Sequence, residues 1–232
     1  LSDSGVWGVP IGVSAEFVFL FVLFGSLLER AGAANYFVQV AFAALGQFRG
    51  GPAKAAVVAS GMTGLVSGSS IANVATTGTF TIPLMKRVGF PDYKAAAVEV
   101  AASTNGQIMP PVMGAAALVM ADLTEIPYLH IIIAALIPAL AYYASLFASV
   151  VFESRRLGIE AVADLSDTET DADLVVHRQD YYNLILVFVP IVTVVVALLY
   201  GFSPAGAGNI ALTVLIPLSF LNPEVRKTPI LI

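Results

Sequence analysis

Long apolar runs separated by short polar connections dominate this chain. The longest runs cover residues 11–28, 94–122, 127–152, 181–200 and 205–221. A bilayer core of about 30 Å needs roughly 20 helical residues, so these runs predict an all-α integral membrane protein. The run at 33–48 is shorter and contains Asn35, Gln39 and Gln47, a pattern typical of a helix lying along the membrane interface or of a short tilted helix.

A polar turn that contains glycine lies between two further apolar runs. The turn is Ser67-Gly68-Ser69-Ser70, and the flanking runs cover 53–66 and 71–85. At a rise of about 1.5 Å per residue, each run reaches only roughly 21–23 Å, which is less than the bilayer core. The pattern therefore predicts a re-entrant helical hairpin over 52–86, a device that brings backbone groups to the membrane midplane in transporters.

The basic residues indicate which connections face the cytoplasm. All eleven lie in a few short stretches: Arg30, Arg49, Lys54, Lys86, Arg87, Lys94, Arg155, Arg156, Arg178, Arg226 and Lys227. The connections at 1–10, 122–127 and 201–204 contain none. Under the positive-inside rule, we expect a multi-pass protein of the inner or plasma membrane, with both ends of the hairpin in the cytoplasm. The acidic stretch 158–180 is then a cytoplasmic loop, and its acidity suggests a high-salt cytoplasm.

Composition supports the membrane assignment. Hydrophobic residues make up 58% of the chain and charged residues 12%, against about 25% charged residues in soluble domains. The absence of cysteine excludes disulfides and thiolate metal sites. The chain starts at Leu1 without a signal-peptide pattern and stops soon after Lys227, so we expect a fragment of a longer membrane protein.

A second polar cluster, Ser103-Thr104-Asn105-Gly106-Gln107, interrupts the run at 94–122. Pro110 and Pro111 follow it, and proline has no amide donor and clashes with the preceding helical turn. Gly106 supplies the backbone freedom for a break. We therefore predict a broken helix, with the break facing the hairpin turn.

A broken helix leaves backbone groups without partners, and such groups must face protein, water or a ligand in a membrane. Carbonyl and hydroxyl oxygens suit a hard cation such as Na⁺, and the N-terminus of a half-helix suits an anionic group. The alternative is that these small polar residues only pack helices together. The candidate ion- or substrate-binding residues are Ser67, Gly68, Ser69, Ser70, Asn73, Thr76, Thr77, Ser103, Thr104, Asn105, Gly106, Gln107 and Pro110.

Glu99 is an ionisable residue within the interrupted run, five residues after Lys94. We expect an interfacial carboxylate paired with Lys94 or Arg87. The alternative is a proton or cation site, because intramembrane carboxylates are commonly functional. The sequence shows no nucleophile–base pair, phosphate loop or metal-ligand spacing. We therefore expect no enzyme, no cofactor, no nucleic-acid partner, and no metal beyond Na⁺ at the two clusters.

Two long motifs resemble a known family. SGSSIANVATTGTFTIPLMKRVGFP at 67–91 and AAAVEVAASTNGQIMPPVMGAAALVMAD at 95–122 are similar to the large membrane subunit of TRAP transporters, most of all the fused permeases of the TAXI subgroup. The resemblance covers roughly 14–158. It implies an ion-coupled symporter, usually driven by Na⁺, that takes up small organic acids by an elevator-type movement.

The resemblance also implies partners and a domain organisation. The partners are an extracytoplasmic substrate-binding protein, a small membrane subunit or its fused equivalent, and a second inverted repeat that this chain lacks. Residues 1–50 would be scaffold-like, 51–157 half of the transport domain, 158–180 the acidic loop and 181–232 two further spans. The other functions left open are a carboxylate symporter without a binding protein, a channel and a structural membrane subunit.

Overall fold

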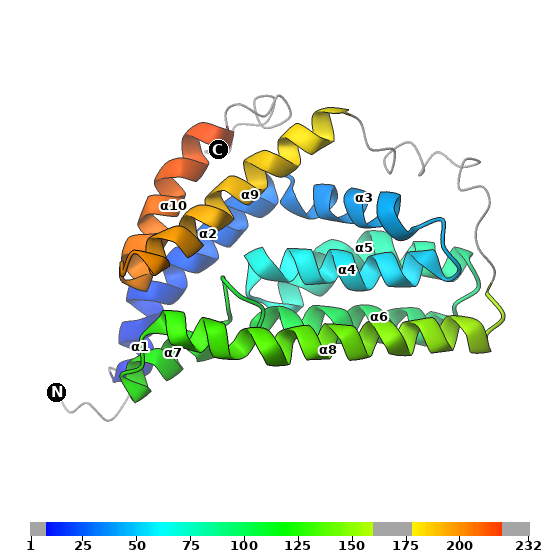
Figure 1. The fold of residues 1–232 in the computed structure, drawn as a ribbon, viewed down its shortest axis with the longest axis horizontal. Helices are drawn as coiled ribbons and strands as arrows, with labels where there is room; N and C mark the ends of the chain where they lie inside the picture. Colours follow the sequence, from blue (N-terminus) through cyan, green and yellow to red (C-terminus); the bar gives the residue numbers. More distant parts are fainter. Residues whose placement is uncertain (1–7, 160–177, 220–232) are drawn as a thin grey trace.

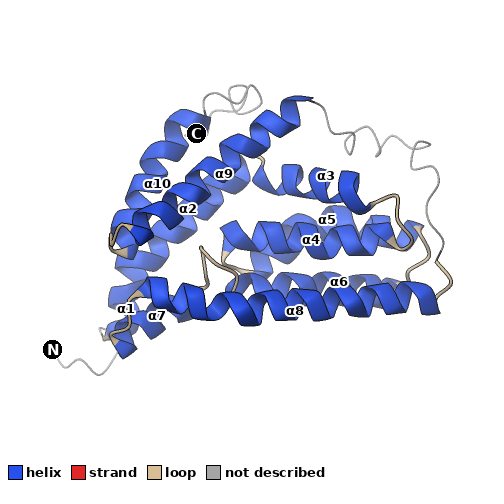
Figure 2. Ribbon diagram, viewed as in Figure 1, coloured by secondary structure: helices blue, strands red, loops and turns tan. Residues whose placement is uncertain are grey.

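The computed structural model describes residues 8–159 and 178–219, and this part of the chain is helical, with no strand (Figures 1 and 2). The first helical stretch consists of α1 (Val9–Val13), a π-helical segment η1 (Ser14–Val18) and α2 (Phe19–Arg30). The remaining elements are α3 (Ala33–Leu45), α4 (Gly51–Ser67), α5 (Ser70–Arg87), α6 (Asp92–Thr104), η2 (Asn105–Gln107), α7 (Ala115–Thr124), α8 (Tyr128–Arg156), α9 (Arg178–Leu199) and α10 (Pro204–Ser219).

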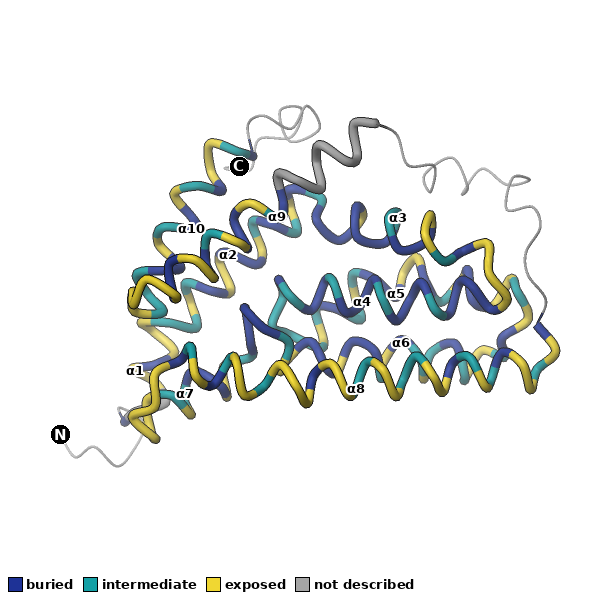
Figure 3. Tube along the Cα trace, in the orientation of Figure 1, coloured by how far each residue is buried: buried dark blue, intermediate teal, exposed yellow. Residues whose placement is uncertain are grey.

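Two helical stretches of the described chain, Ile11–Arg30 and Tyr128–Arg156, are long and apolar enough to cross a membrane. Both coincide with predicted spans. The second is α8, whose outward positions are exposed along its length (Figure 3), among them Ile133 and Ile137. An apolar, exposed helix face is unfavourable in water and is the face that lipid or another apolar helix covers.

α4 and α5 form a helical hairpin, as the sequence predicts, but its legs are longer than the predicted 14 and 15 residues. The legs contain 17 and 18 residues, which is about 26 and 27 Å of helix. α4 starts earlier because Gly50 adopts a left-handed conformation and Pro52 favours the first helical turn. The re-entrant path of the hairpin through a bilayer stays a prediction.

α3, predicted as an interfacial helix, packs along the hairpin legs and α9 (Figure 1). Its aromatic residues Tyr36, Phe37 and Phe42 are buried. This helix therefore covers the hairpin on one side, while α6 and α8 lie on the other. α9 and α10 pack against each other, and α10 packs on α2.

The break predicted within 94–122 is confirmed. α6 ends at Thr104, η2 covers Asn105–Gln107, and α7 starts only at Ala115. The intervening segment contains a cis peptide bond between Pro110 and Pro111. α6 and α7 both pack against the long helix α8. α8 therefore runs alongside the break and contacts the helices on both sides of it.

Tyrosines of α8 satisfy the carbonyl groups that the break sets free. The last carbonyls of a helix have no partner within it. The hydroxyl of Tyr142 donates to the carbonyl of Ala101 at 2.9 Å, and that of Tyr143 donates to the carbonyl of Ala102 at 3.0 Å. Within the break, the hydroxyl of Tyr128 donates to the carbonyl of Pro111 at 3.0 Å. The positions of these tyrosines on α8 are therefore explained by backbone capping.

Three of the regions predicted to be cytoplasmic meet at one end of the bundle. The α3–α4 loop, the α5–α6 loop and the C-terminal end of α8 lie together there (Figure 1). Lys94 pairs with Glu153, and the Arg49 Nε donates to the carbonyl of Ile159 at 2.8 Å. Most of the acidic loop 158–180 lies outside the described residues.

Removing the hydroxyl of either capping tyrosine should destabilise the protein. Tyr142→Phe and Tyr143→Phe each leave a backbone carbonyl without its donor, which costs about 1–3 kcal/mol. Chemical unfolding of the purified full-length protein in detergent measures the loss. Tyr93→Phe is the matched control, because Tyr93 is 70% exposed. Equal stability of all three variants would contradict the capping role.

Candidate functional site

The turn between α4 and α5, the hairpin tip, is ordered by its own polar groups. Gly68 lies in the left-handed region with φ of 56°, where glycine is favoured. Ser69 is the N-cap of α5, and its hydroxyl accepts a hydrogen bond from the Ala72 N–H at 3.3 Å. The Ser67 hydroxyl donates to the carbonyl of Ser69 at 3.3 Å. Ser67 and Ser69 therefore hold the turn in shape.

The structure brings the hairpin tip against the break, as the sequence predicts. The Gln107 Nε2 donates to the Ser70 hydroxyl at 2.8 Å. A Cβ on Gly64 would lie 2.9 Å from the Cα of Gly106, and a Cβ on Gly68 would lie 2.9 Å from the carbonyl oxygen of Val112. The close approach therefore requires glycine at Gly64 and Gly68, and we call this contact the tip–break junction.

Asn73 and Asn105 carry buried amide oxygens at this junction. Asn73 is completely buried and Asn105 is 2% exposed. Their Nδ2 groups donate to the carbonyls of Ser60 at 2.9 Å and Ala139 at 3.1 Å. The Oδ1 atom of each has no hydrogen-bond partner. Since buried polar atoms are nearly always paired, two unpaired oxygens among the residues of the junction indicate a place for a bound ligand.

Asn73 contacts Gly106, the residue that follows Asn105. The Nδ2 of Asn73 lies 3.3 Å from the position that a Cβ on Gly106 would occupy. A hard cation binds such neutral oxygens together with carbonyls of unwound helices. The junction is therefore suited to a small cation.

Glu99 is completely buried, so the expected interfacial pairing with Lys94 or Arg87 is wrong. Lys94 pairs with Glu153 instead. Glu99 Oε1 accepts hydrogen bonds from the hydroxyls of Ser60 at 2.9 Å, of Ser103 at 3.1 Å and of Thr77, and Oε2 accepts one from Thr81 at 2.6 Å. We call these four hydroxyl residues and Glu99 the Glu99 cluster.

The remaining predicted site residues are not all directed into the junction. The hydroxyls of Thr76 and Thr104 donate to the carbonyls four residues earlier, Ala72 and Val100, both at 2.7 Å. Thr77 and Ser103 point their hydroxyls at Glu99. Pro110 is buried in the irregular segment that follows η2.

The sequence analysis misses two members of the Glu99 cluster, Ser60 and Thr81. Ser60 is a polar residue in the apolar run of the first hairpin leg, and Thr81 follows Thr77 by four residues, which places both threonines on one helix face. A polar residue inside an apolar run was the available signal. The partner that explains it, Glu99, lies far away in sequence.

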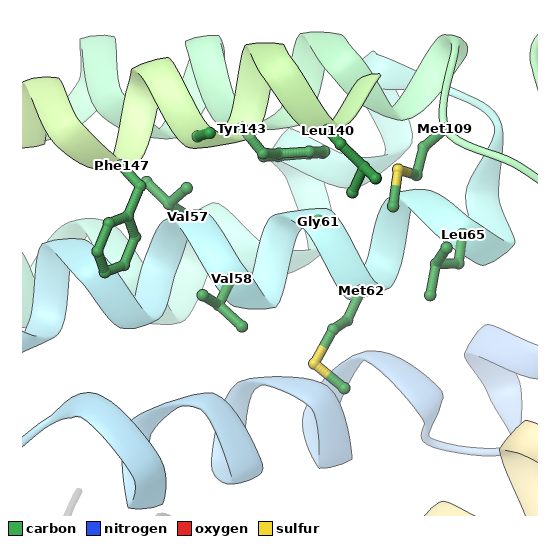
Figure 4. A pocket seen from close by; sticks show the side chains of 10 residues that line it. Val57, Val58, Gly61, Met62, Leu65, Met109, Leu140, Tyr143 and Phe147 are labelled. Carbon is green, nitrogen blue, oxygen red and sulfur yellow. The ribbon is translucent and has the colours of Figure 1, made fainter. Parts of the chain in front are cut away.

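Two hollows flank the junction. A cavity of about 540 Å³ is bordered by the tip, by Gln107 and by the start of α7, with Ser69, Gly114, Met120 and Ile131 among its lining residues. A second, apolar hollow of about 370 Å³ lies between α4 and α8. Val57, Met62, Leu140 and Phe147 line it (Figure 4). The first contains the polar groups of the tip, whereas the second offers only apolar contact.

Residues 4–229 match the family described as "Tripartite ATP-independent periplasmic transporter, DctM component". A C4-dicarboxylate TRAP transporter large permease protein of Pseudomonas aeruginosa is 36% identical over 120 residues, which are 52% of this chain and 28% of the relative. The corresponding protein of Vibrio cholerae is 38% identical over 91 residues, 39% of this chain and 20% of the relative.

An ectoine/5-hydroxyectoine TRAP transporter large permease protein of Ruegeria pomeroyi is 33% identical over 95 residues, 41% of this chain and 22% of the relative. The chain thus matches less than a third of the length of these relatives. The family comprises transporter permeases rather than enzymes, as the sequence analysis expects. The match over nearly the whole chain shows that this protein belongs to the DctM family of large permease components of TRAP transporters.

Proposed function

We propose that this chain is part of the permease of an ion-coupled secondary transporter that imports small organic acids with the help of an extracytoplasmic binding protein. Its family supports the permease role. The observation that carries the coupling is the tip–break junction, where Asn73 and Asn105 hold unpaired buried oxygens. Partners of the permease would be the binding protein, a small membrane subunit or its fused equivalent, and a second repeat.

The coupling ion in this proposal is Na⁺, bound by the Oδ1 atoms of Asn73 and Asn105 together with backbone carbonyls of the break. These oxygens are buried and lack donors, so a cation would supply the missing partner. The competing ion is a proton at Glu99. The Glu99 carboxylate already accepts hydrogen bonds from four hydroxyls, which makes the asparagines the better-suited cation site.

The substrate in this proposal is a small anion that enters the cavity beside the hairpin tip. The start of α7 borders this cavity, and a helix N-terminus favours an anionic group. The similar proteins of P. aeruginosa and R. pomeroyi carry C4-dicarboxylate and ectoine in their names. Organic acids bearing a carboxylate are therefore the class to test first.

The movement in this proposal is elevator-like, with α4 to α8 as half of the transport domain and α1 to α3 on the scaffold side. Dense packing among α4, α5 and α6 supports their moving as one body.

The TAXI-type fused organisation remains the predicted subtype. A carboxylate symporter without a binding protein is the alternative, and a secreted receptor encoded beside the permease would distinguish the two.

The loops at 86–94 should face the cytoplasm and the α7–α8 connection the outside. Tyr93 and Leu123 are exposed, and this chain contains no cysteine. In right-side-out vesicles, a membrane-impermeant maleimide should label Leu123→Cys directly and Tyr93→Cys only after permeabilisation. Any cysteines elsewhere in the full-length permease are replaced first. Labelling of Tyr93→Cys in sealed vesicles would contradict the orientation.

Substitution of either junction asparagine should weaken Na⁺ dependence. In liposomes containing the full-length transporter and supplied with its binding protein, Asn73→Ala and Asn105→Ala should raise the Na⁺ concentration for half-maximal uptake at least about tenfold, which corresponds to roughly 1.4 kcal/mol of binding free energy. Sodium and proton gradients are imposed separately. Asn209→Ala is the control, because Asn209 is exposed on α10.

Two results would contradict this proposal. In one, both junction variants keep the Na⁺ half-saturation of the wild type and of Asn209→Ala. In the other, a proton gradient alone drives uptake by the wild type.

A further inference from the structure

Glu99 is completely buried between the hairpin and α6, and the proposed function assigns it no role. We propose that Glu99 is a positioning residue that fixes Asn73 and Asn105 in the orientation needed to bind the coupling cation. This inference rests on the proposed Na⁺ site and adds a residue that acts on that site through hydrogen-bonded neighbours.

The Glu99 cluster connects the hairpin legs to the broken helix. Ser60 comes from α4, Thr77 and Thr81 come from α5, and Glu99 and Ser103 come from α6. All of these side chains are completely buried. Since a buried carboxylate is unfavourable unless it is hydrogen-bonded, the carboxylate draws the hydroxyls of both legs towards α6.

One branch of the cluster leads to Asn73. Ser60 donates to Glu99 Oε1 through its hydroxyl at 2.9 Å, and its carbonyl accepts the Asn73 Nδ2 at 2.9 Å. The Thr77 hydroxyl, which also contacts Oε1, lies 2.8 Å from the carbonyl of Asn73. The side chain of Asn73 is thus one hydrogen bond away from Ser60, which Glu99 holds, and the carbonyl of Asn73 lies beside Thr77.

The other branch leads to Asn105. Ser103 donates to Glu99 Oε1 at 3.1 Å and lies two residues before Asn105, in the last turn of α6. Tyr143 of α8 donates to the carbonyl of Ala102 at 3.0 Å. The end of α6 is therefore fixed from two sides just before the chain reaches Asn105.

Thr81 differs from the other three hydroxyl residues because neither branch passes through it. Its hydroxyl contacts Oε2 at 2.6 Å and the Thr77 carbonyl of its own helix at 3.0 Å. Thr81→Val therefore removes a member of the cluster without removing a link to either asparagine. This variant is the matched control.

The same geometry makes glutamine a conservative replacement at Glu99. In Glu99→Gln, a side-chain amide oxygen in the Oε1 position would still accept the Ser60, Thr77 and Ser103 hydroxyls. The amide nitrogen would donate to Thr81, whose own proton would go to the Thr77 carbonyl. Leucine has a similar volume but accepts no hydrogen bond, so Glu99→Leu breaks both branches.

The test compares Glu99→Leu, Glu99→Gln and Thr81→Val in the full-length transporter. Glu99→Leu should raise the Na⁺ half-saturation of uptake by about 10–100-fold, as loss of an outer partner does at metal sites. It should change the maximal rate at saturating Na⁺ much less. Glu99→Gln and Thr81→Val should stay within about threefold of the wild type, because both keep the branches to the asparagines.

Two outcomes would overturn the inference. If Glu99→Gln is as impaired as Glu99→Leu, Glu99 acts through its charge or a proton and not by positioning. If Glu99→Leu lowers the unfolding temperature but leaves the Na⁺ half-saturation unchanged, the cluster is only structural.

A structure of Glu99→Leu gives a readout that does not depend on the identity of the coupling ion. The Asn73 Nδ2 should lose its bond to the Ser60 carbonyl, and retention of that bond would overturn the positioning role. Uptake by the wild type without Na⁺ dependence would refute the Na⁺ site, while this structural readout would still decide the role of Glu99.

Discussion

The arrangement of α6, α7 and α8 depends on one constraint: backbone polar groups in an apolar environment need hydrogen-bond partners. A helix that breaks between Thr104 and Ala115 frees carbonyls that lipid cannot pair. α8 runs past the break, and hydroxyls of its tyrosines donate hydrogen bonds to the carbonyls of Ala101 and Ala102. The break is therefore a fixed feature of the fold. Because it is held rigidly, it can present oxygen atoms in a defined arrangement, which is what a binding site for a small ion requires.

The hairpin completes the arrangement from the other side. Glycines allow its tip to approach the break more closely than a Cβ would permit, and Asn73 then lies beside Gly106. The Glu99 cluster holds the legs behind the tip. In this account the polar groups have different roles: some hold the backbone in shape, one buried carboxylate positions its neighbours, and two amide oxygens are left for a ligand.

The sequence predicts the hairpin and the break well, because both depend on local signals: the Ser67–Ser70 turn and the pair Pro110-Pro111. It also predicts that they face each other. It does not predict the length of the legs, of which the first starts earlier because of Gly50 and Pro52. It misplaces Glu99, because Lys94 is five residues away in sequence but pairs with Glu153, and the true partners come from three different helices. Long-range partners of this kind follow from packing, not from periodicity. The roles of individual hydroxyls, such as those of Thr77 and Ser103, cannot be predicted from the sequence either, because they too depend on how the helices pack.

The central claim is that the Asn73 and Asn105 oxygens at the tip–break junction hold the coupling cation. The most direct measurement is a pair of high-resolution structures of the full-length transporter, one in Na⁺ and one in a large organic cation that cannot enter. The account predicts a density peak within about 2.3–2.6 Å of the amide oxygens, a range typical of hard-cation ligands, only in the Na⁺ structure. Amide oxygens that accept hydrogen bonds from protein donors in both structures, with no such peak, would contradict it.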